Sequence, residues 1–166
     1  PLRRLGKTEV IKRAYHKLFF EQDEVVPIFF SYENLKPDYK EFAEKYILNF
    51  LQQYFAFKTK DRKYFKIDTL EDMLSKINKE ESIGIDYFIS RIKSNLDGNN
   101  VFGLCHNAVH GPKDVSFQNE EGIIVFLDEF QYIYQDDEKK GAEFDLRGEF
   151  QGGVELWRCP HIVTGS

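Results

Sequence analysis

The pattern of apolar and polar positions is organised around a short apolar run that ends in two carboxylates. Residues 122–127 are followed directly by Asp128 and Glu129. A continuous apolar run of this length is typical of a strand buried on both faces, as in a parallel sheet. Open α/β sheets bind ligands at the carboxyl ends of their strands. We therefore expect the two acids to face a polar cleft or a cation; a strand that ends in solvated acids is the alternative.

Two more strands are predicted, one before and one after this run in the chain. Residues 25–32 are largely apolar, and Pro27 suits the start of a strand better than its middle. Residues 159–166 form a short strand that ends in Thr-Gly-Ser. The hydroxyls of Thr164 and Ser166 are therefore expected to face the same crevice as the two acids, with an ordinary turn as the alternative.

Apolar residues at helical spacing predict the helices. In chain order, they fall at residues 9–20, 37–57, 69–78, 85–97 and 143–157. The first is expected to bury the face formed by Val10, Ile11, Ala14, Leu18 and Phe19. The second carries a wide aromatic face, which packing against the sheet explains better than base stacking does. Residues 59–120 are expected to form a helical and irregular insertion between two strands.

A phosphate-binding loop is predicted at the start of the chain. The second half of the pattern Gly, four residues, Gly-Lys-Ser/Thr is matched by Leu5, Gly6, Lys7 and Thr8. In such loops the backbone N–H groups and the lysine hold phosphates, and the hydroxyl binds Mg²⁺. A helix that begins directly afterwards points the positive end of its dipole at the phosphates. Pro1 stands where the first glycine belongs, so we expect a fragment that begins within the motif; a complete but atypical loop is the alternative.

Composition narrows the class of protein. The chain has 166 residues, of which 31% are charged and 42% hydrophobic, which fits one folded domain and excludes a disordered segment. The net charge of −5 argues against a broad nucleic-acid-binding surface, although not against a local basic patch. No apolar run is long enough to cross a membrane, and the two cysteines indicate a reducing compartment. We therefore expect a cytoplasmic protein without membrane contact.

Metal-ligand residue types occur at two places in the chain. Cys105, His106 and His110 form one group, and Cys159 and His161 form the other. Four such ligands can make a tetrahedral zinc site. The spacings match no common zinc motif, and the chain has no Cys-x-x-Cys. A loop histidine and a buried thiol therefore explain these residues better than zinc does.

Three segments taken together resemble the archaeal-type ATPases, P-loop proteins near the AAA+ and STAND ATPases. They are Arg-Arg-Leu-Gly-Lys-Thr at residues 3–8, Leu-Asp-Glu-Phe-Gln at residues 127–131 and His-Ile-Val-Thr-Gly-Ser at residues 161–166. The resemblance implies an α/β class, three-layer α/β/α P-loop NTPase fold with a mostly parallel sheet, lacking the strand before the phosphate loop. It also implies that residues 1–166 are a partial ATPase domain, from Walker A to sensor 1, with the last strand beside the strand at residues 122–128.

The same resemblance implies ATP and Mg²⁺ as ligands and gives each matching residue a role. Phosphate binding falls to the Walker A segment, which is Leu5, Gly6, Lys7, Thr8 and Glu9. Thr8 and Asp128 would hold Mg²⁺. Glu129 would polarise the attacking water while Lys7 neutralises phosphate charge, so these two are the expected catalytic residues. Catalysis would rest on positioning and electrostatics.

The resemblance also places Thr164 and Ser166 at the sensor-1 position, where they would contact the γ-phosphate. The family's arginine finger cannot be assigned, and Arg147 and Arg158 are candidates only in name. Three functions compete: an ATPase, a nucleotide-operated switch or scaffold with little turnover, and a DNA-handling ATPase like the origin-recognition proteins. Besides ATP, the expected partners are a protein client or DNA, bound through domains outside this chain, and further copies of the chain.

Overall fold

Among the residues that the structure describes, three strands form one parallel sheet, and the chain is of the α/β class. The computed structural model describes residues 6–33, 35, 38–77, 84–133, 145–154 and 158–165. Strands β1 (Val25–Ser31), β2 (Gly122–Asp128) and β3 (His161–Val163) lie in the order β1–β2–β3. β1 and β2 pair along their whole length, so that Ser31 stands opposite Asp128 at the carboxyl end. β2 is therefore the central strand of the described sheet, as its apolar sequence predicts.

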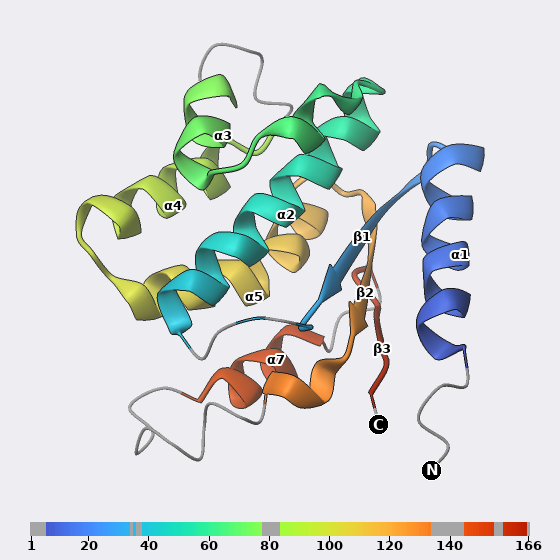
Figure 1. Cartoon of the computed structure of the whole chain (residues 1–166). Helices are drawn as coiled ribbons and strands as arrows, with labels where there is room; N and C mark the ends of the chain where they lie inside the picture. Colours follow the sequence, from blue (N-terminus) through green and yellow to red (C-terminus); the bar gives the residue numbers. More distant parts are fainter. Residues whose placement is uncertain are drawn as a thin grey trace.

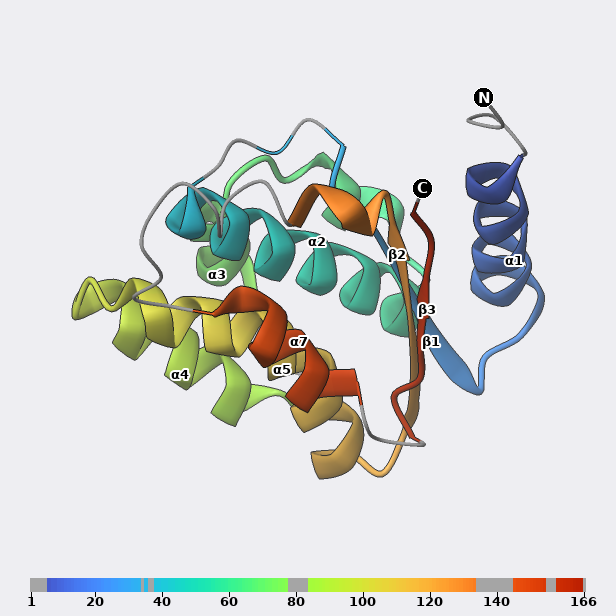
Figure 2. The same cartoon turned by 90° about the horizontal axis from the view of Figure 1, so that it is seen from below.

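Helices cover both faces of this sheet (Figures 1 and 2). Helix α1 (Lys7–Glu21) packs against β1 and β2 on one face, whereas α2 (Tyr39–Thr59) and α5 (Val101–Gln118) pack on the other. The remaining described helices lie outside this pair or near the carboxyl end of the sheet: η1 (Arg62–Lys66), α3 (Leu70–Ile77), α4 (Asp86–Asp97), η2 (Phe130–Ile133) and α7 (Leu146–Val154). No helix in the described part of the chain has the length and apolar character needed to cross a membrane.

The aromatic face of α2 forms the centre of the core. Asp38 caps the helix by accepting a hydrogen bond from the Glu41 N–H at 2.8 Å. The buried residues of α2 include Phe42, Tyr46, Phe50, Tyr54 and Phe57. The ring of Tyr46 lies 4.6 Å from that of Phe30 on β1, measured between centroids. Packing against the sheet, rather than base stacking, is thus confirmed for this face.

Helix α1 begins at Lys7, two residues before the predicted start, and confirms the predicted buried face at Ile11, Leu18 and Phe19 but not at Val10 and Ala14. Ile11 and Phe19 are buried, with Tyr15 and Leu18 half-buried beside them. The expected burial of Val10 is wrong, because this side chain is 66% exposed, and Ala14 is exposed too. Ile11, Tyr15, Leu18 and Phe19 share the face of the helix that packs on the sheet. Val10 is exposed because neighbouring residues of a helix project from different sides, which turns Val10 away from this face.

Helix α5 is the element that the sequence pattern missed. It runs without a break from Val101 to Gln118, through the helix-breaking residues Gly111 and Pro112. Asn100 caps its start by accepting from the Gly103 N–H at 3.0 Å. A Cβ on Gly111 would lie 2.6 Å from the Phe88 ring, so glycine lets α4 approach closely. Tertiary packing thus outweighs the low helix propensity of these two residues.

The outer edge of β1 is covered by a side chain of α2. Pro27 lies inside β1, opposite Ile124, and not at its start as predicted. The Gln53 amide accepts from the Phe29 N–H at 2.8 Å and donates to the Phe29 carbonyl at 3.0 Å. In a parallel strand the N–H and carbonyl of one residue point to the same side, and those of the next residue point to the opposite side. Tyr32 donates its N–H to the Asp128 carbonyl of β2, so even-numbered residues of β1 face β2. The backbone groups of the odd-numbered residues Pro27 and Phe29 therefore point away from β2.

Candidate functional site

The carboxyl end of the sheet gathers side chains from three distant parts of the chain. The Thr8 hydroxyl donates to Asp128 Oδ1 at 3.1 Å, and the Thr164 hydroxyl donates to the same oxygen at 2.6 Å. Lys7 Nζ donates to the Gly165 carbonyl at 3.1 Å. The structure therefore brings together four of the residues singled out in the sequence, and the hydroxyl of Thr164 faces Asp128 as expected.

Asp128 is fixed by the strand that it ends. Its backbone carbonyl accepts from the Tyr32 N–H at 3.0 Å, which ties it to the end of β1. The residue is only 3% exposed, and no cationic side chain of the described residues lies within ion-pair distance of its carboxylate. Two neutral hydroxyls donate to Oδ1 of this carboxylate. A buried carboxylate with this environment is suited to receive a cation.

Thr164 is positioned by its backbone as well as by its hydroxyl. Its N–H donates to the Leu127 carbonyl at 2.8 Å, and its carbonyl accepts from the Phe130 N–H at 2.9 Å. These bonds continue the β2–β3 ladder one residue beyond β3 and hold the turn after β2. Thr164 thus lies beside Asp128 because of strand pairing, which the sequence alone could only suggest.

Glu129 occupies a strained backbone position next to Asp128. Its φ is +55°, in the left-handed region that residues with a Cβ seldom adopt. The Glu129 carboxylate accepts a hydrogen bond from the Gln131 side-chain amide. A Cβ on Gly165 would come within 2.6 Å of the Gln131 amide oxygen, so glycine leaves room for this amide. Gln131 had no predicted role, although its place two residues after Glu129 in the Asp-Glu-Phe-Gln segment is a signal for it.

The N-terminus of α1 opens toward this edge of the sheet. Gly6 is its N-cap residue, with φ +69° and with open space where a Cβ would stand. Glycine is therefore required here by backbone conformation and not by crowding. Gly6 has no side chain that could cap the helix, so the N-cap residue itself leaves the first N–H groups available to an anion.

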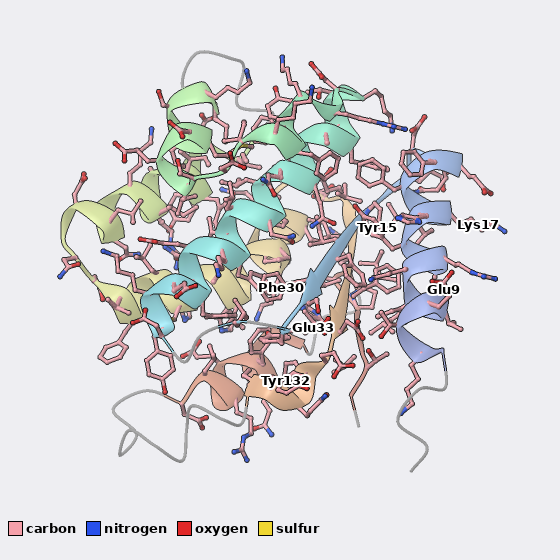
Figure 3. All side chains as sticks on the ribbon, viewed as in Figure 1. Glu9, Tyr15, Lys17, Phe30, Glu33 and Tyr132 are labelled. Atoms are coloured by element: carbon pink, nitrogen blue, oxygen red, sulfur yellow. The ribbon has the colours of Figure 1, made fainter. Side chains whose placement is uncertain are left out.

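Two predicted residues lie outside the described part, and one lies apart from the site. The structure does not describe Leu5 or Ser166. Glu9 lies one turn into α1, where its carboxylate accepts from Arg13 Nε at 2.8 Å. The Arg13 guanidinium holds the pKa of Glu9 below its ordinary value. Figure 3 shows Glu9 and Lys17 on α1, with Lys17 pointing away from the sheet and Tyr15 on the side toward it. Glu9 is engaged along its own helix, and no contact joins it to Asp128.

The metal-ligand residues separate into different surroundings. Cys105 and Cys159 are buried free thiols, and burial raises the pKa of each to about 12. His161 begins β3, where its Nδ1 lies 2.9 Å from the Cys159 carbonyl and burial lowers its pKa. His106 and His110 lie on helix α5, so the prediction of a loop histidine is wrong. Both contact Glu149 of α7, a residue that sequence reasoning missed.

Comparisons with known proteins do not bear on the site at the carboxyl end of the sheet. Comparison of the chain with family models, with curated proteins and with solved structures finds no match. The resemblance to archaeal-type ATPases therefore stays a prediction, and function is argued from the side chains around Asp128.

Proposed function

We propose that this chain adopts a P-loop NTPase arrangement and binds and hydrolyses Mg²⁺·ATP at the carboxyl end of its sheet. One observation carries the proposal: the hydroxyl of Thr8, the residue after Gly6-Lys7, donates to the buried carboxylate that ends the central strand. This is the juxtaposition that a phosphate loop and a Walker B strand require. The two residues are separated by most of the chain, so local sequence does not dictate their contact.

The donor set fits magnesium. Thr8 and Asp128 offer a hydroxyl and a carboxylate oxygen 3.1 Å apart, and Mg²⁺ prefers oxygen ligands of this kind. The hydrogen bond between them would open so that both oxygens face the ion. When bound, Mg²⁺ supplies positive charge to the β- and γ-phosphate oxygens.

The start of α1 fits a phosphate chain. Gly6 in the left-handed conformation turns the backbone into the helix, whose uncapped N–H groups favour an anion. Lys7 is exposed and bonded only to the Gly165 carbonyl among the described residues, so its ammonium can leave that carbonyl for phosphate oxygens. The exchange replaces a neutral acceptor with a charged one, which strengthens the hydrogen bond.

Glu129 and Thr164 complete the proposed reaction. Glu129 orients the attacking water and accepts its proton, and Thr164 contacts the γ-phosphate beside Asp128. Ser166 keeps its proposed sensor role from the resemblance alone.

A second function is favoured by the partner of Glu129. Because Gln131 donates to the Glu129 carboxylate, the proposed base is engaged within the chain. A protein that binds ATP while Glu129 stays with Gln131 would act as a nucleotide-operated switch with little turnover. The DNA-handling function, a protein client and self-association stay predictions.

Titration with a fluorescent ATP analogue, with and without Mg²⁺, tests the proposal. Saturable binding by the wild-type chain is expected, and Lys7→Ala should abolish it while leaving the circular dichroism spectrum unchanged. Lys17→Ala is the matched control, because Lys17 lies on the same helix and points away from the sheet (Figure 3). Wild-type-like binding by folded Lys7→Ala, or no binding by the wild type, would overturn the phosphate-site assignment.

A further inference from the structure

A second cluster of ligating side chains lies between α5 and α7. His106 Nδ1 and His110 Nε2 each lie 2.9 Å from the same oxygen, Glu149 Oε2. The two imidazole rings stack with their centroids 4.3 Å apart and an angle of 23° between their planes. The cluster shares no residue with the site around Asp128, so it does not belong to the proposed phosphate site.

The positions of these three side chains follow from helix geometry and core packing. Residues four apart lie on the same face of a helix, which places His106 and His110 one turn apart on α5. Glu149 comes from α7, which packs against α5. Its neighbour Phe150 is buried, with its ring 6.1 Å from that of Tyr46. α7 is therefore anchored by the core, and the cluster is preformed and not dependent on its own hydrogen bonds.

We propose that His106, His110 and Glu149 bind a divalent transition-metal ion of the Zn²⁺ class. Two imidazole nitrogens and one carboxylate oxygen are ligands that suit zinc, with one further position left open. Mg²⁺, which favours oxygen ligands, is expected to be excluded.

The distances support metal ligation. The three ligand atoms all lie within 4.8 Å of one another. In a tetrahedral zinc site, ligand atoms at about 2.0–2.2 Å from the ion lie roughly 3.3 Å from each other. The 2.9 Å contacts to Glu149 therefore need to widen by only a few tenths of an ångström. Rotamer adjustments of two imidazoles and a carboxylate provide such a change without moving a helix.

The burial of the cluster leaves one side open. The side chain of His110 is 13% exposed and that of Glu149 is 27% exposed, whereas that of His106 is 45% exposed. An ion can therefore enter beside His106, and the fourth ligand position faces solvent there. Water would occupy that position, as it does in zinc sites with three protein ligands.

Isothermal titration with Zn²⁺ tests this site directly. One ion per wild-type chain is expected, with saturable binding that excess Mg²⁺ does not displace. His106→Gln, His110→Gln and Glu149→Gln should each weaken binding by at least the roughly 10- to 100-fold typical of an outer-shell change, because each removes a ligand. His16→Gln is the matched control, since His16 is an exposed histidine on α1.

Cobalt absorption identifies the ligands even if a variant fails to fold. Co²⁺ added to the wild-type chain should give the visible bands of a tetrahedral site without the near-ultraviolet thiolate band that Cys105 or Cys159 would produce. The absence of saturable Zn²⁺ binding, a thiolate band, or equal loss of affinity in His16→Gln would each overturn the proposal. These readouts are independent of ATP hydrolysis, so they separate this site from the proposed function.

Discussion

At Glu129 the backbone conformation favours glycine, whereas the proposed chemistry needs a carboxylate. A left-handed φ costs roughly 1 kcal/mol or more for a residue with a Cβ. The same turn brings the Phe130 N–H to the Thr164 carbonyl and places the Glu129 carboxylate against the Gln131 amide. A carboxylate therefore stands at a position where the backbone conformation favours glycine.

Substitution of Glu129 should separate stability from turnover. Glu129→Gly relieves the left-handed strain, so the free energy of unfolding should stay equal or rise by up to about 1 kcal/mol, while phosphate release stops. Glu129→Gln keeps the backbone, and it should retain ATP binding while turnover falls by about 10²–10⁴-fold. Urea unfolding and single-turnover phosphate release measure the two effects. Wild-type hydrolysis in Glu129→Gln would show that another group activates the water.

His161 should make the chain less stable in mild acid. Its pKa is lowered by burial, and its Nε2 has no hydrogen-bond partner among the described residues. The folded chain therefore favours neutral imidazole, so the contribution to stability is complete above the ordinary histidine pKa of about 6.5 and is lost as pH falls below it. Urea unfolding at about pH 7.5 and about pH 5.5 measures the loss.

His161→Gln is the control for this pH dependence. It should lose less stability on acidification than the wild type does. A residual slope is expected from His110, whose pKa is also lowered by burial. An unchanged slope in His161→Gln would assign the acid sensitivity to other groups.

At the scale of an element, α2 shows that two tyrosines on one helix can differ in how their hydroxyl groups contribute to stability. Tyr46 and Tyr54 are both fully buried tyrosines on its inner face. The Tyr54 hydroxyl donates to the Glu121 carboxylate and accepts from Asn119 Nδ2 at 3.0 Å. The Tyr46 hydroxyl has no hydrogen-bond partner among the described residues. Burial of a polar group is unfavourable unless it is paired.

Tyr46→Phe and Tyr54→Phe should therefore have opposite effects. Removal of the unpaired Tyr46 hydroxyl should leave the free energy of unfolding equal or raise it by up to about 1 kcal/mol. Removal of the paired Tyr54 hydroxyl should lower it by about 1–3 kcal/mol, because Glu121 and Asn119 lose a partner. Urea unfolding of both variants, with equal m-values as the check, measures the difference. A destabilised Tyr46→Phe would indicate a partner for that hydroxyl.

The elements also differ in how far the sequence predicts them. β2 and α2 follow from apolar runs and helical spacing, because each buries a wide face against its neighbours. α1 is predicted as a helix, although it buries only a narrow stripe of the predicted face. α5 contains Gly111 and Pro112, which local propensity assigns to a loop, and only the close approach of Phe88 on α4 explains the glycine. The convergence around Asp128 was anticipated from motif order. The partnership of Glu149 with two histidines was not, because a contact between helices leaves no trace in residue spacing.

At the scale of the whole molecule, α1 is attached differently from the other described helices. It lies by itself on one face of the sheet, whereas the rest gather on the other face and around the carboxyl end (Figures 1 and 2). Its N-terminus is tied to the sheet by the Thr8–Asp128 and Lys7–Gly165 hydrogen bonds. Mg²⁺·ATP bound there would join this helix to β2 and β3.

Ligand binding should therefore stabilise the junction between α1 and the sheet. Mg²⁺·ATP at 100 times its dissociation constant should raise the free energy of unfolding by about 2.7 kcal/mol. Amide hydrogen exchange should slow in α1 and at the carboxyl ends of the strands. Asp128→Asn should lose the part of this effect that depends on Mg²⁺. Equal protection by ATP with and without Mg²⁺ would contradict the role given to Asp128.

The amide of Gln53 has a consequence for how the molecule meets copies of itself. At the outer edge of β1, Pro27 has no N–H to donate and both backbone groups of Phe29 are hydrogen-bonded to Gln53, so this stretch of the edge offers no free N–H to a strand from another molecule. β3, with Ile162 and Val163 exposed, is the opposite edge of the described sheet. Fibre growth by edge pairing needs two usable edges on every molecule. Pairing through β1 is therefore disfavoured, and we expect strand-mediated association of the described sheet to run through β3 and to end at a two-fold dimer.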